Sequence, residues 1–327
     1  MNQDRTPAPG HALLWTLLFV LLAVAAVVFN TRQTRVVVIR AASQEDPAAR
    51  AFDAGLRAGF GPRARVDVRS LRIASGAADP GKYCESTLYA IDDLRPTLLV
   101  AVGEKAEVCL LRSEQARRTP ALLVGAGVSA RPATMAAVMP MLPRQTWTEA
   151  LRSQAVPGRP YRVLYLAADS AAGRAERDQF ATLAVPGVSV ATQLAADFAQ
   201  WQGAVRAAAG RADLLVVGAG RTLLALPAGW SDGKLVAHSG AAFGAAIAAT
   251  DVEAVGQGAA WAIAPDAHGL GNQAAAAALV LLERDSMPAA PPAILIAIDA
   301  AMNEGQRPLP PLFISVARHQ GRYLARK

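Results

Sequence analysis

The longest uninterrupted apolar run lies close to the N-terminus. Residues 13–29 read LLWTLLFVLLAVAAVVF, and Thr16 is the only polar side chain among them. A helix of about 17 residues reaches the lower limit for crossing a bilayer, whereas the apolar core of a cleaved signal usually holds about 7–15 residues. The run therefore favours an uncleaved membrane anchor, with these bulky members: Leu13, Trp15, Phe19 and Phe29.

Two alternatives to the anchor remain open. The triplet ending at Ala25 could be a cleavage site, although Val27, Val28 and Phe29 continue the apolar run beyond it. A buried core helix is the other alternative, but an apolar surface on all sides is not typical of a short helix in a small domain. The run predicts insertion into a membrane or export through it.

After this run, buried-type strands alternate with amphipathic helices. Residues 35–40 (RVVVIR) form a continuous apolar strand, which is typical of a parallel sheet covered on both faces. A helix follows, because Phe52, Leu56 and Phe60 recur at every fourth position. Further strands are expected at 66–71, 98–102 and 121–124, with helices at 81–94 and 104–112. This order predicts a parallel sheet with helices on both faces.

The pattern restarts in the second half of the chain, after a connection at about 129–144. Strands are expected at 161–167, 188–192, 214–217 and 234–237, and helices at 172–183 and 198–209. The end of the chain departs from a simple tandem. It predicts a long helix at 266–284, a Pro-rich stretch at 287–292, a strand at 293–297, a short helix at 299–304 and a closing strand at 312–316. We expect two similar α/β lobes, one after the other.

The chain is basic, with a net charge of +7, and Lys occurs only at positions 82, 105, 234 and 327. The arginines are scattered along the sequence. A basic chain suits a membrane surface or an anionic ligand, but coding bias and solvated helix faces explain the charge equally simply. No interleaving of Arg with aromatic residues indicates a nucleic-acid surface.

The two cysteines, Cys84 and Cys109, form no C-x-x-C motif and no cluster with histidine, so a structural metal site is not expected. Outside the cytoplasm they could form a disulfide, and otherwise they are two separate buried thiols. The sequence leaves both alternatives open.

Ligands of open parallel sheets bind at the carboxyl ends of the strands. In the first half, this rule selects polar residues that follow the first, third and fourth strands: Ser43, Gln44, Glu104, Lys105 and Ser129. In the second half it selects Asp169, Ser170, Arg221, Thr222, His238 and Ser239. Arg221 is the sharpest candidate, because a guanidinium facing a cleft suits a carboxylate. For any single one of them, an ordinary solvated loop residue is the simpler interpretation.

The sequence contains no complete motif for nucleotide binding or for catalysis. The segments GAG at 125–127 and 218–220 do not complete G-x-G-x-x-G, and no Gly-Lys-Ser/Thr is present. The sequence has no G-x-S-x-G, and adjacent His238 and Ser239 do not make a triad, which is built by fold geometry. We predict no catalytic residue, no metal and no cofactor.

The order of elements resembles a type 1 periplasmic binding protein, and more narrowly the ABC-transporter substrate-binding family that includes binders of aromatic amino acids. The resemblance spans about 36–311 and rests on FDAG at 52–55, RPT at 95–97, the entry to a second lobe at 139–151, APD at 264–266, HGLG at 268–271 and IDAA at 298–301 with Pro308 and Pro310. Three segments near the expected cleft depart from the family pattern. VSA at 128–130 replaces Asp-Pro, ATMAA at 133–137 replaces N-x-T-G, and GRT at 220–222 replaces Thr-Asp.

The resemblance implies an N-terminal helix and connector (1–34) followed by two doubly wound parallel-sheet lobes with a hinge. Lobe 1 would comprise 35–140 and about 266–288, and lobe 2 would comprise 141–265 and about 289–327. It implies a periplasmic solute-binding protein of an importer, tethered to the inner membrane or cleaved and soluble. A small polar ligand, such as a carboxylate or amino acid, would sit between the lobes, and a membrane permease would be the partner. The altered cleft segments favour an alternative, an accessory subunit of a membrane complex with an eroded pocket.

Overall fold

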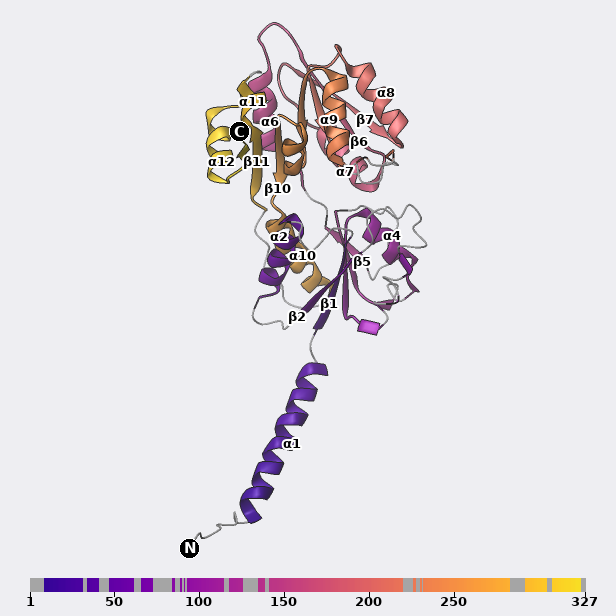
Figure 1. Cartoon of the computed structure of the whole chain (residues 1–327), viewed down its shortest axis with the longest axis vertical. Coiled ribbons are helices and arrows are strands. Elements are labelled where there is room, and N and C mark those ends of the chain that lie inside the picture. Colours follow the sequence, from indigo (N-terminus) through magenta and orange to yellow (C-terminus); the bar gives the residue numbers. More distant parts are fainter. Residues whose placement is uncertain are drawn as a thin grey trace.

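The computed structural model describes residues 9–31, 34–40, 47–61, 66–72, 84–85, 89, 91, 93–114, 118–125, 135–138, 141–219, 226–227, 230, 232–282, 292–304 and 308–324. These residues form an isolated N-terminal helix and two α/β lobes stacked along the long axis of the molecule (Figure 1). The prediction of two doubly wound lobes is confirmed.

Lobe 1 is built on a five-stranded sheet of order β2-β1-β3-β4-β5, in which every neighbouring pair is parallel. Its strands are β1 (Thr34–Arg40), β2 (Val66–Arg72), β3 (Leu98–Val102), β4 (Ala121–Val124) and β5 (Met135–Val138). The central strands β3 and β4 are almost wholly buried. Continuous apolar runs such as these are expected in a parallel sheet covered on both faces.

Two helices cover one face of this sheet: α2 (Pro47–Phe60) and α10 (Ala267–Leu281). Phe52, Leu56 and Phe60 of α2 pack with Ala274 and Ala278 of α10 against β1, β3 and β4. The opposite face is covered by α4 (Glu104–Arg112) and by Cys84, Ile91 and Leu94. A helix that comes from the far end of the chain therefore completes the core of lobe 1.

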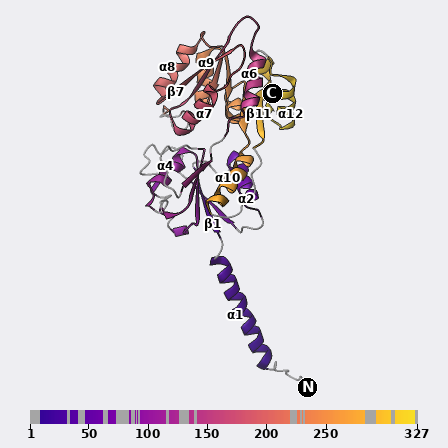
Figure 2. The same cartoon turned by 180° about the vertical axis from the view of Figure 1, so that it is seen from behind.

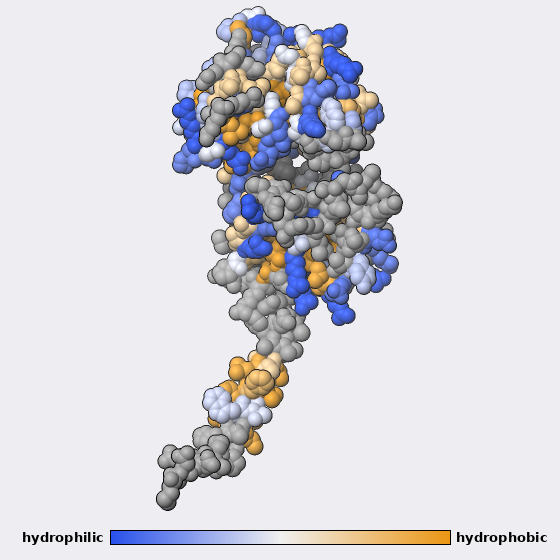
Figure 3. Space-filling view, viewed as in Figure 1, coloured by the Kyte–Doolittle hydropathy of each residue, from blue (hydrophilic) through white to orange (hydrophobic). Residues whose placement is uncertain are grey.

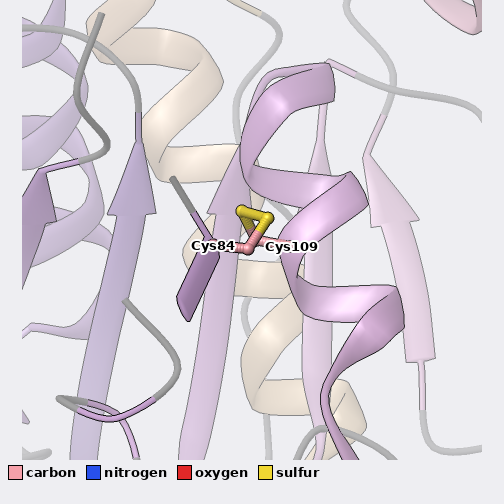
Figure 4. Close-up of a disulfide and its surroundings, with 2 residues drawn as sticks. All are labelled: Cys84 and Cys109. Carbon is pink, nitrogen blue, oxygen red and sulfur yellow. A yellow bond between two sulfur atoms is a disulfide. The ribbon is translucent and has the colours of Figure 1, made fainter. Parts of the chain in front are cut away.

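In the structure the two cysteines form a disulfide, so of the two alternatives the bonded one holds (Figure 4). Cys84 and Cys109 are both almost fully buried, and they join α4 to the chain segment that precedes β3. The disulfide closes 25 residues of chain on the α4 face of lobe 1.

Lobe 2 is built on a seven-stranded sheet of order β12-β11-β10-β9-β8-β6-β7. Its strands are β6 (Tyr161–Ala168), β7 (Val188–Ala195), β8 (Leu214–Val217), β9 (Ala246–Ala249), β10 (Trp261–Pro265), β11 (Ile294–Asp299) and β12 (Tyr323–Leu324). All neighbouring pairs are parallel except β10 and β11, which are antiparallel. The sheet is therefore mixed at the edge where the chain returns from lobe 1.

The helices of lobe 2 cover both faces of its sheet. One core is formed with α6 (Arg144–Gln154), α7 (Ala171–Ala181) and α12 (Pro311–His319), and it centres on Trp147, Tyr165 and Phe180. The other is formed with α8 (Phe198–Ala208), α9 (Asp232–Phe243) and the 3₁₀ helix η2 (Val252–Gln257). The short α11 (Ala300–Glu304) follows β11, as predicted for that segment.

Two predicted strands are wrong, because the structure has helices there. Residues 234–237 lie inside α9, and residues 312–316 lie inside α12. A short apolar run is compatible with either a strand or a buried helix. The buried positions decide for a helix: Leu235, Ser239 and Phe243 recur every fourth residue in α9, as Phe313 and Ala317 do in α12. Strands β5, β9, β10 and β12 were not predicted.

The chain crosses between the lobes next to α10. The ladder between β10 and β11 ends at the pair Pro265 and Ile294, and it is extended by a 2.7 Å hydrogen bond from the Asp266 N–H to the Ala293 carbonyl. Asp266 also caps α10 by accepting a hydrogen bond from the Gly269 N–H at 3.0 Å. These contacts hold two of the crossing segments side by side.

Helix α1 (Pro9–Thr31) projects from lobe 1, and its described side chains, from Leu13 to Ala25, are all exposed (Figures 1 and 2). None of them belongs to a core cluster of the described residues. Within the part of the chain that the structure describes, no helix is found to be both long and apolar enough to span a bilayer.

Candidate functional site

The carboxyl ends of the parallel strands in the two lobes point toward each other. Strand β1 begins next to α1 and runs toward lobe 2. Strand β6 follows α6 and runs in the opposite sense, toward lobe 1 (Figure 1). The space-filling view shows the molecule hollowed between the lobes (Figure 3). Because ligands of open parallel sheets bind at carboxyl ends, this inter-lobe hollow is the candidate site.

A buried ion pair anchors the lobe 1 side of the hollow. Arg40, the last residue of β1, places Nη1 2.8 Å from Oδ1 of Asp53 and 3.2 Å from the carbonyl oxygen of Ala49, both on α2. The two side chains are only 4% and 10% exposed. Sequence reasoning missed this pair, although an acid between Phe52 and Leu56 on the apolar face of α2 indicates a buried partner.

The lobe 1 candidates lie only partly within the described residues. Ser43, Gln44 and Ser129 lie outside them. Glu104 is the first residue of α4, and Lys105 follows it as a half-buried side chain. Gly103, in the left-handed region at φ 81°, turns the chain from β3 into this helix, a conformation that glycine adopts without steric cost. α4 therefore starts at the carboxyl edge and directs its N-terminus toward the hollow.

Two lobe 2 candidates, Asp169 and Ser170, form the turn from β6 into α7. The buried Ser170 hydroxyl accepts a hydrogen bond from the Gly173 N–H at 2.9 Å and so caps the helix. Asp169 is exposed and forms an ion pair with Arg174 at 2.6 Å. Ser170 therefore has a structural role in the turn, whereas the Asp169–Arg174 pair is accessible at the hollow.

Arg221 and Thr222 lie outside the described residues, and the description of the chain before them ends at Ala219. The Glu176 carboxylate accepts hydrogen bonds from the Tyr165 hydroxyl and from the Ala219 N–H, each at 2.7 Å. Gly218 packs so closely on Tyr165 that a Cβ there would lie 2.1 Å from the phenol oxygen. Glu176, which sequence reasoning missed, thus fixes the backbone at Ala219, which lies just beyond the carboxyl end of β8.

His238 and Ser239 lie within α9 and not at a strand end. The Ser239 hydroxyl is buried, donates to the Leu235 carbonyl at 2.8 Å and accepts from Trp201 Nε1 at 3.0 Å. His238 Nε2 lies 3.1 Å from the side-chain nitrogen of Gln202, and its ring packs edge-on against Trp230. Ser239 therefore holds α9 against α8, and His238 belongs to an aromatic cluster on the same pair of helices.

Comparisons with known proteins place the fold. No family model and no curated protein matches the sequence. An ABC domain from Streptococcus pneumonia in complex with L-Trp has a similar structure (TM-score 0.61, 14% identity, covering 87% of this chain and 98% of that one). A ligand-free, open substrate-binding protein with adhesive properties from Clostridium difficile is also similar (TM-score 0.57, 13% identity, covering 85% of this chain and 96% of that one). A third similar structure is a carbohydrate transporter solute-binding protein from Agrobacterium Radiobacter in complex with D-arabinose (TM-score 0.50, 12% identity, covering 87% of this chain and 99% of that one). The chain has the type 1 periplasmic binding protein fold.

A second hollow lies at the far end of this periplasmic binding protein fold, beyond the amino ends of the lobe 2 strands. It measures about 310 Å³, and its lining includes Gln154, Tyr161, Arg159 and Asp213. Asp213 pairs with Arg159 and accepts hydrogen bonds from the Arg162 N–H and Nε at 2.9 and 3.2 Å. Burial alone would raise the pKa of Asp213, but the Arg162 hydrogen bonds and both guanidinium charges outweigh it and lower the pKa.

Neither hollow holds a metal-binding set among the described residues, where no group of three His, Cys, Asp or Glu side chains comes together. The far hollow is separated from the inter-lobe hollow by the length of the lobe 2 strands, and its Arg–Asp contacts tie β6 to β8. The candidate ligand site of the fold is therefore the inter-lobe hollow.

Proposed function

We propose that this protein binds a small polar solute between its two lobes and delivers it to a membrane permease. The observation that carries the proposal is that the parallel strands of both lobes turn their carboxyl ends toward each other across a hollow, next to the crossing segments at Asp266 and Ala293. A ligand that contacts both edges would favour the closed arrangement, and closure would be a hinge motion at the crossing segments. We place the boundaries between the two lobes in the three segments that cross from one lobe to the other, near residues 140, 265 and 289. The role is non-catalytic.

The ligand carries a carboxylate. Helices α4, α7 and α8 all begin at the carboxyl edges, so their N-terminal partial positive charges point at the hollow. Arg221 and Thr222 follow β8 in the sequence and would supply a guanidinium and a hydroxyl. The similar structures contain L-Trp in one case and D-arabinose in another, which supports a small polar solute of amino-acid or sugar size.

The protein works on the outer side of the cytoplasmic membrane, tethered there by α1. The apolar residues 13–29 and the exposed side chains from Leu13 to Val24 support a membrane role for this helix. The buried disulfide supports an oxidising compartment, because such bonds are rare in the reducing cytosol.

A ligand screen tests the proposal. Thermal unfolding of the protein would be measured with single amino acids, small carboxylates and sugars, because a ligand that binds only the folded state raises the midpoint by mass action. At a concentration about 100 times its Kd, a true ligand stabilises by about 2.7 kcal/mol, which corresponds to several degrees. Arg221→Ala should abolish the shift, whereas the matched control Arg206→Ala, on the outer surface of α8, should retain it.

The alternative function is an accessory subunit of a membrane complex that keeps the fold without a working pocket. The connection between α1 and β1 favours it, because only residues 32 and 33 separate Thr31 from Thr34. So short a connection leaves lobe 1 little reach from the membrane. No midpoint shift with any ligand class, together with co-purification of a membrane protein, would decide for this alternative.

A further inference from the structure

Helix α1 leaves lobe 1 at the edge opposite the inter-lobe hollow. It connects through two residues to the start of β1, and β1 is an interior strand of the lobe 1 sheet. Both cartoon views place α1 beyond the amino ends of these strands, on the side away from lobe 2 (Figures 1 and 2). Whatever α1 is embedded in therefore lies next to this amino edge of lobe 1.

Arginines from four separate segments gather at the same edge. In a β-α-β sheet, the helix C-termini and the strand starts share one edge. Here that edge brings together the last turn of α2, the turn that precedes β3, the last turn of α4 and the segment that precedes β4. The four arginines at these places are Arg57, Arg95, Arg112 and Arg118, named the basic edge below. The space-filling view has strongly hydrophilic residues at this end of lobe 1, above α1 (Figure 3).

These side chains are not used to hold the lobe together. All four arginines are exposed, and Arg57, Arg95 and Arg112 have no carboxylate within ion-pair distance among the described residues. Arg118 pairs with Glu114 at 3.3 Å, but both side chains are more than three-quarters exposed, so the pair is weak. Two exposed acidic side chains, Asp93 and Glu114, are described near this edge, and they do not balance the charge of the four arginines.

Arg95 carries a second observation. Its φ of 44° lies in the left-handed region, and it is the only residue other than glycine with a positive φ among those described. Pro96 follows it and further disfavours a helical-type conformation at the preceding residue. Glycine would adopt this turn without cost, so an arginine at this position carries a local conformational penalty. Arg57 and Arg112 lie in the last turns of helices, where a positive charge interacts favourably with the helix dipole. Arg95 lies in no helix, so the helix dipole does not explain its presence.

We propose that the basic edge binds anionic phospholipid headgroups and seats lobe 1 directly on the membrane surface. Lobe 2 and the inter-lobe hollow then lie on the side away from the bilayer, and any permease must reach the ligand from the flank of the protein. The inference rests on the proposed membrane role of α1, which sets which surface faces the lipid. Clusters of arginine beside a membrane helix attract anionic lipid through charge.

The test uses residues 30–327, which should fold on their own because the described side chains of α1 belong to no core cluster. Co-sedimentation would be measured with vesicles of phosphatidylcholine alone and of phosphatidylcholine mixed with phosphatidylglycerol. We expect binding only to the mixed vesicles, weakened by salt. Replacing the four arginines of the basic edge by Gln should reduce the affinity by about fivefold for each arginine.

A matched variant separates the basic edge from the overall charge of the protein. Arg152, Arg177, Arg206 and Arg211 lie on lobe 2, and their replacement by Gln removes the same charge. This control should bind the mixed vesicles as the wild type does. Equal loss in both variants, or no binding by the wild-type fragment, would overturn the proposal.

Arg95→Gly distinguishes a lipid contact from a structural role. Because glycine relieves the left-handed strain, the midpoint of thermal unfolding should stay equal or rise while vesicle binding falls about fivefold. Unchanged vesicle binding in this variant would contradict a lipid contact of Arg95. A negative ligand screen leaves these outcomes intact, because vesicle binding does not require an occupied hollow.

Discussion

Gly55 of α2 lies against the main chain of His268 in the first turn of α10, and a Cβ on Gly55 would come within 1.9 Å of the His268 carbonyl oxygen. On the other side of the same contact, a Cβ on Gly271 would lie 2.2 Å from the Phe52 carbonyl oxygen. The two helices therefore pack backbone to backbone directly below the crossing at Asp266. This contact fastens the returning chain to lobe 1.

Gly55→Ala should destabilise the protein despite the better helix propensity of alanine. The added methyl group forces α2 and α10 apart, and such overpacking typically costs about 1–3 kcal/mol. The measurement is the free energy of unfolding in denaturant. Gly203→Ala is the matched control, because a Cβ on Gly203 in α8 meets nothing within 4 Å, and it should stabilise by about 0.5–1 kcal/mol. Equal effects of the two substitutions would refute the close contact.

The disulfide should contribute substantially to the stability of lobe 1. Closing 25 residues of chain lowers the entropy of the unfolded state, and Cys84→Ser with Cys109→Ser should cost about 3 kcal/mol. The measurement is the thermal midpoint with and without a reductant. The double variant should be insensitive to the reductant. Titration of free thiols in the denatured, unreduced wild type should find none, and two reactive thiols would contradict the bond.

The Arg40–Asp53 pair should be costly to break from one side. Asp53→Ala leaves a buried guanidinium without its carboxylate, which typically costs about 3–5 kcal/mol. Asp178→Ala, which breaks the exposed pair with Arg177, should change stability by less than about 1 kcal/mol. Denaturant unfolding of both variants checks the difference, and comparable losses would mean that the Arg40 charge is solvated.

Asp213 should make stability depend on pH in the acid range. Its pKa is lowered in the folded state, so its contribution is fully present above the ordinary value of 3.8 and is lost as pH falls through the lowered value. Asp213→Asn should therefore be less stable than wild type at neutral pH, and the difference in unfolding free energy should shrink as the solution is acidified below 3.8. A difference that grows on acidification would contradict the assignment.

Local patterns in the sequence were enough to predict most of the fold. The strands at 35–40, 98–102 and 214–217 are apolar runs whose neighbours alternate with helical periods, and such patterns are readable without knowledge of contacts. They failed at 234–237, where a short buried helix and a buried strand have the same composition. Strand β9, which reads AIAA, was missed because its hydrophobicity differs little from that of the Ala-rich residues on either side.

The candidate site was less predictable. The end of a predicted strand places a residue at one edge of the sheet, but it does not tell what the side chain contacts. Asp169 and Ser170 are adjacent, yet the Ser170 hydroxyl is consumed by a helix cap while Asp169 is exposed with Arg174. Glu176 was missed, since nothing near it in sequence indicates that it reaches Tyr165 and Ala219. Hydrogen-bond partners that are 11 and 43 residues apart are set by tertiary packing.

The sequence by itself determined the apolar N-terminal helix, the alternation that builds two α/β lobes and the strand ends at which a ligand would be held, because each follows from the periodicity of neighbouring residues. Only the tertiary structure decided that Cys84 and Cys109 are bonded, that Gly55 admits α10 into lobe 1, and that arginines scattered along the chain meet at one edge beside α1. Packing brings together residues that are far apart in sequence, and no local pattern records which of them will meet.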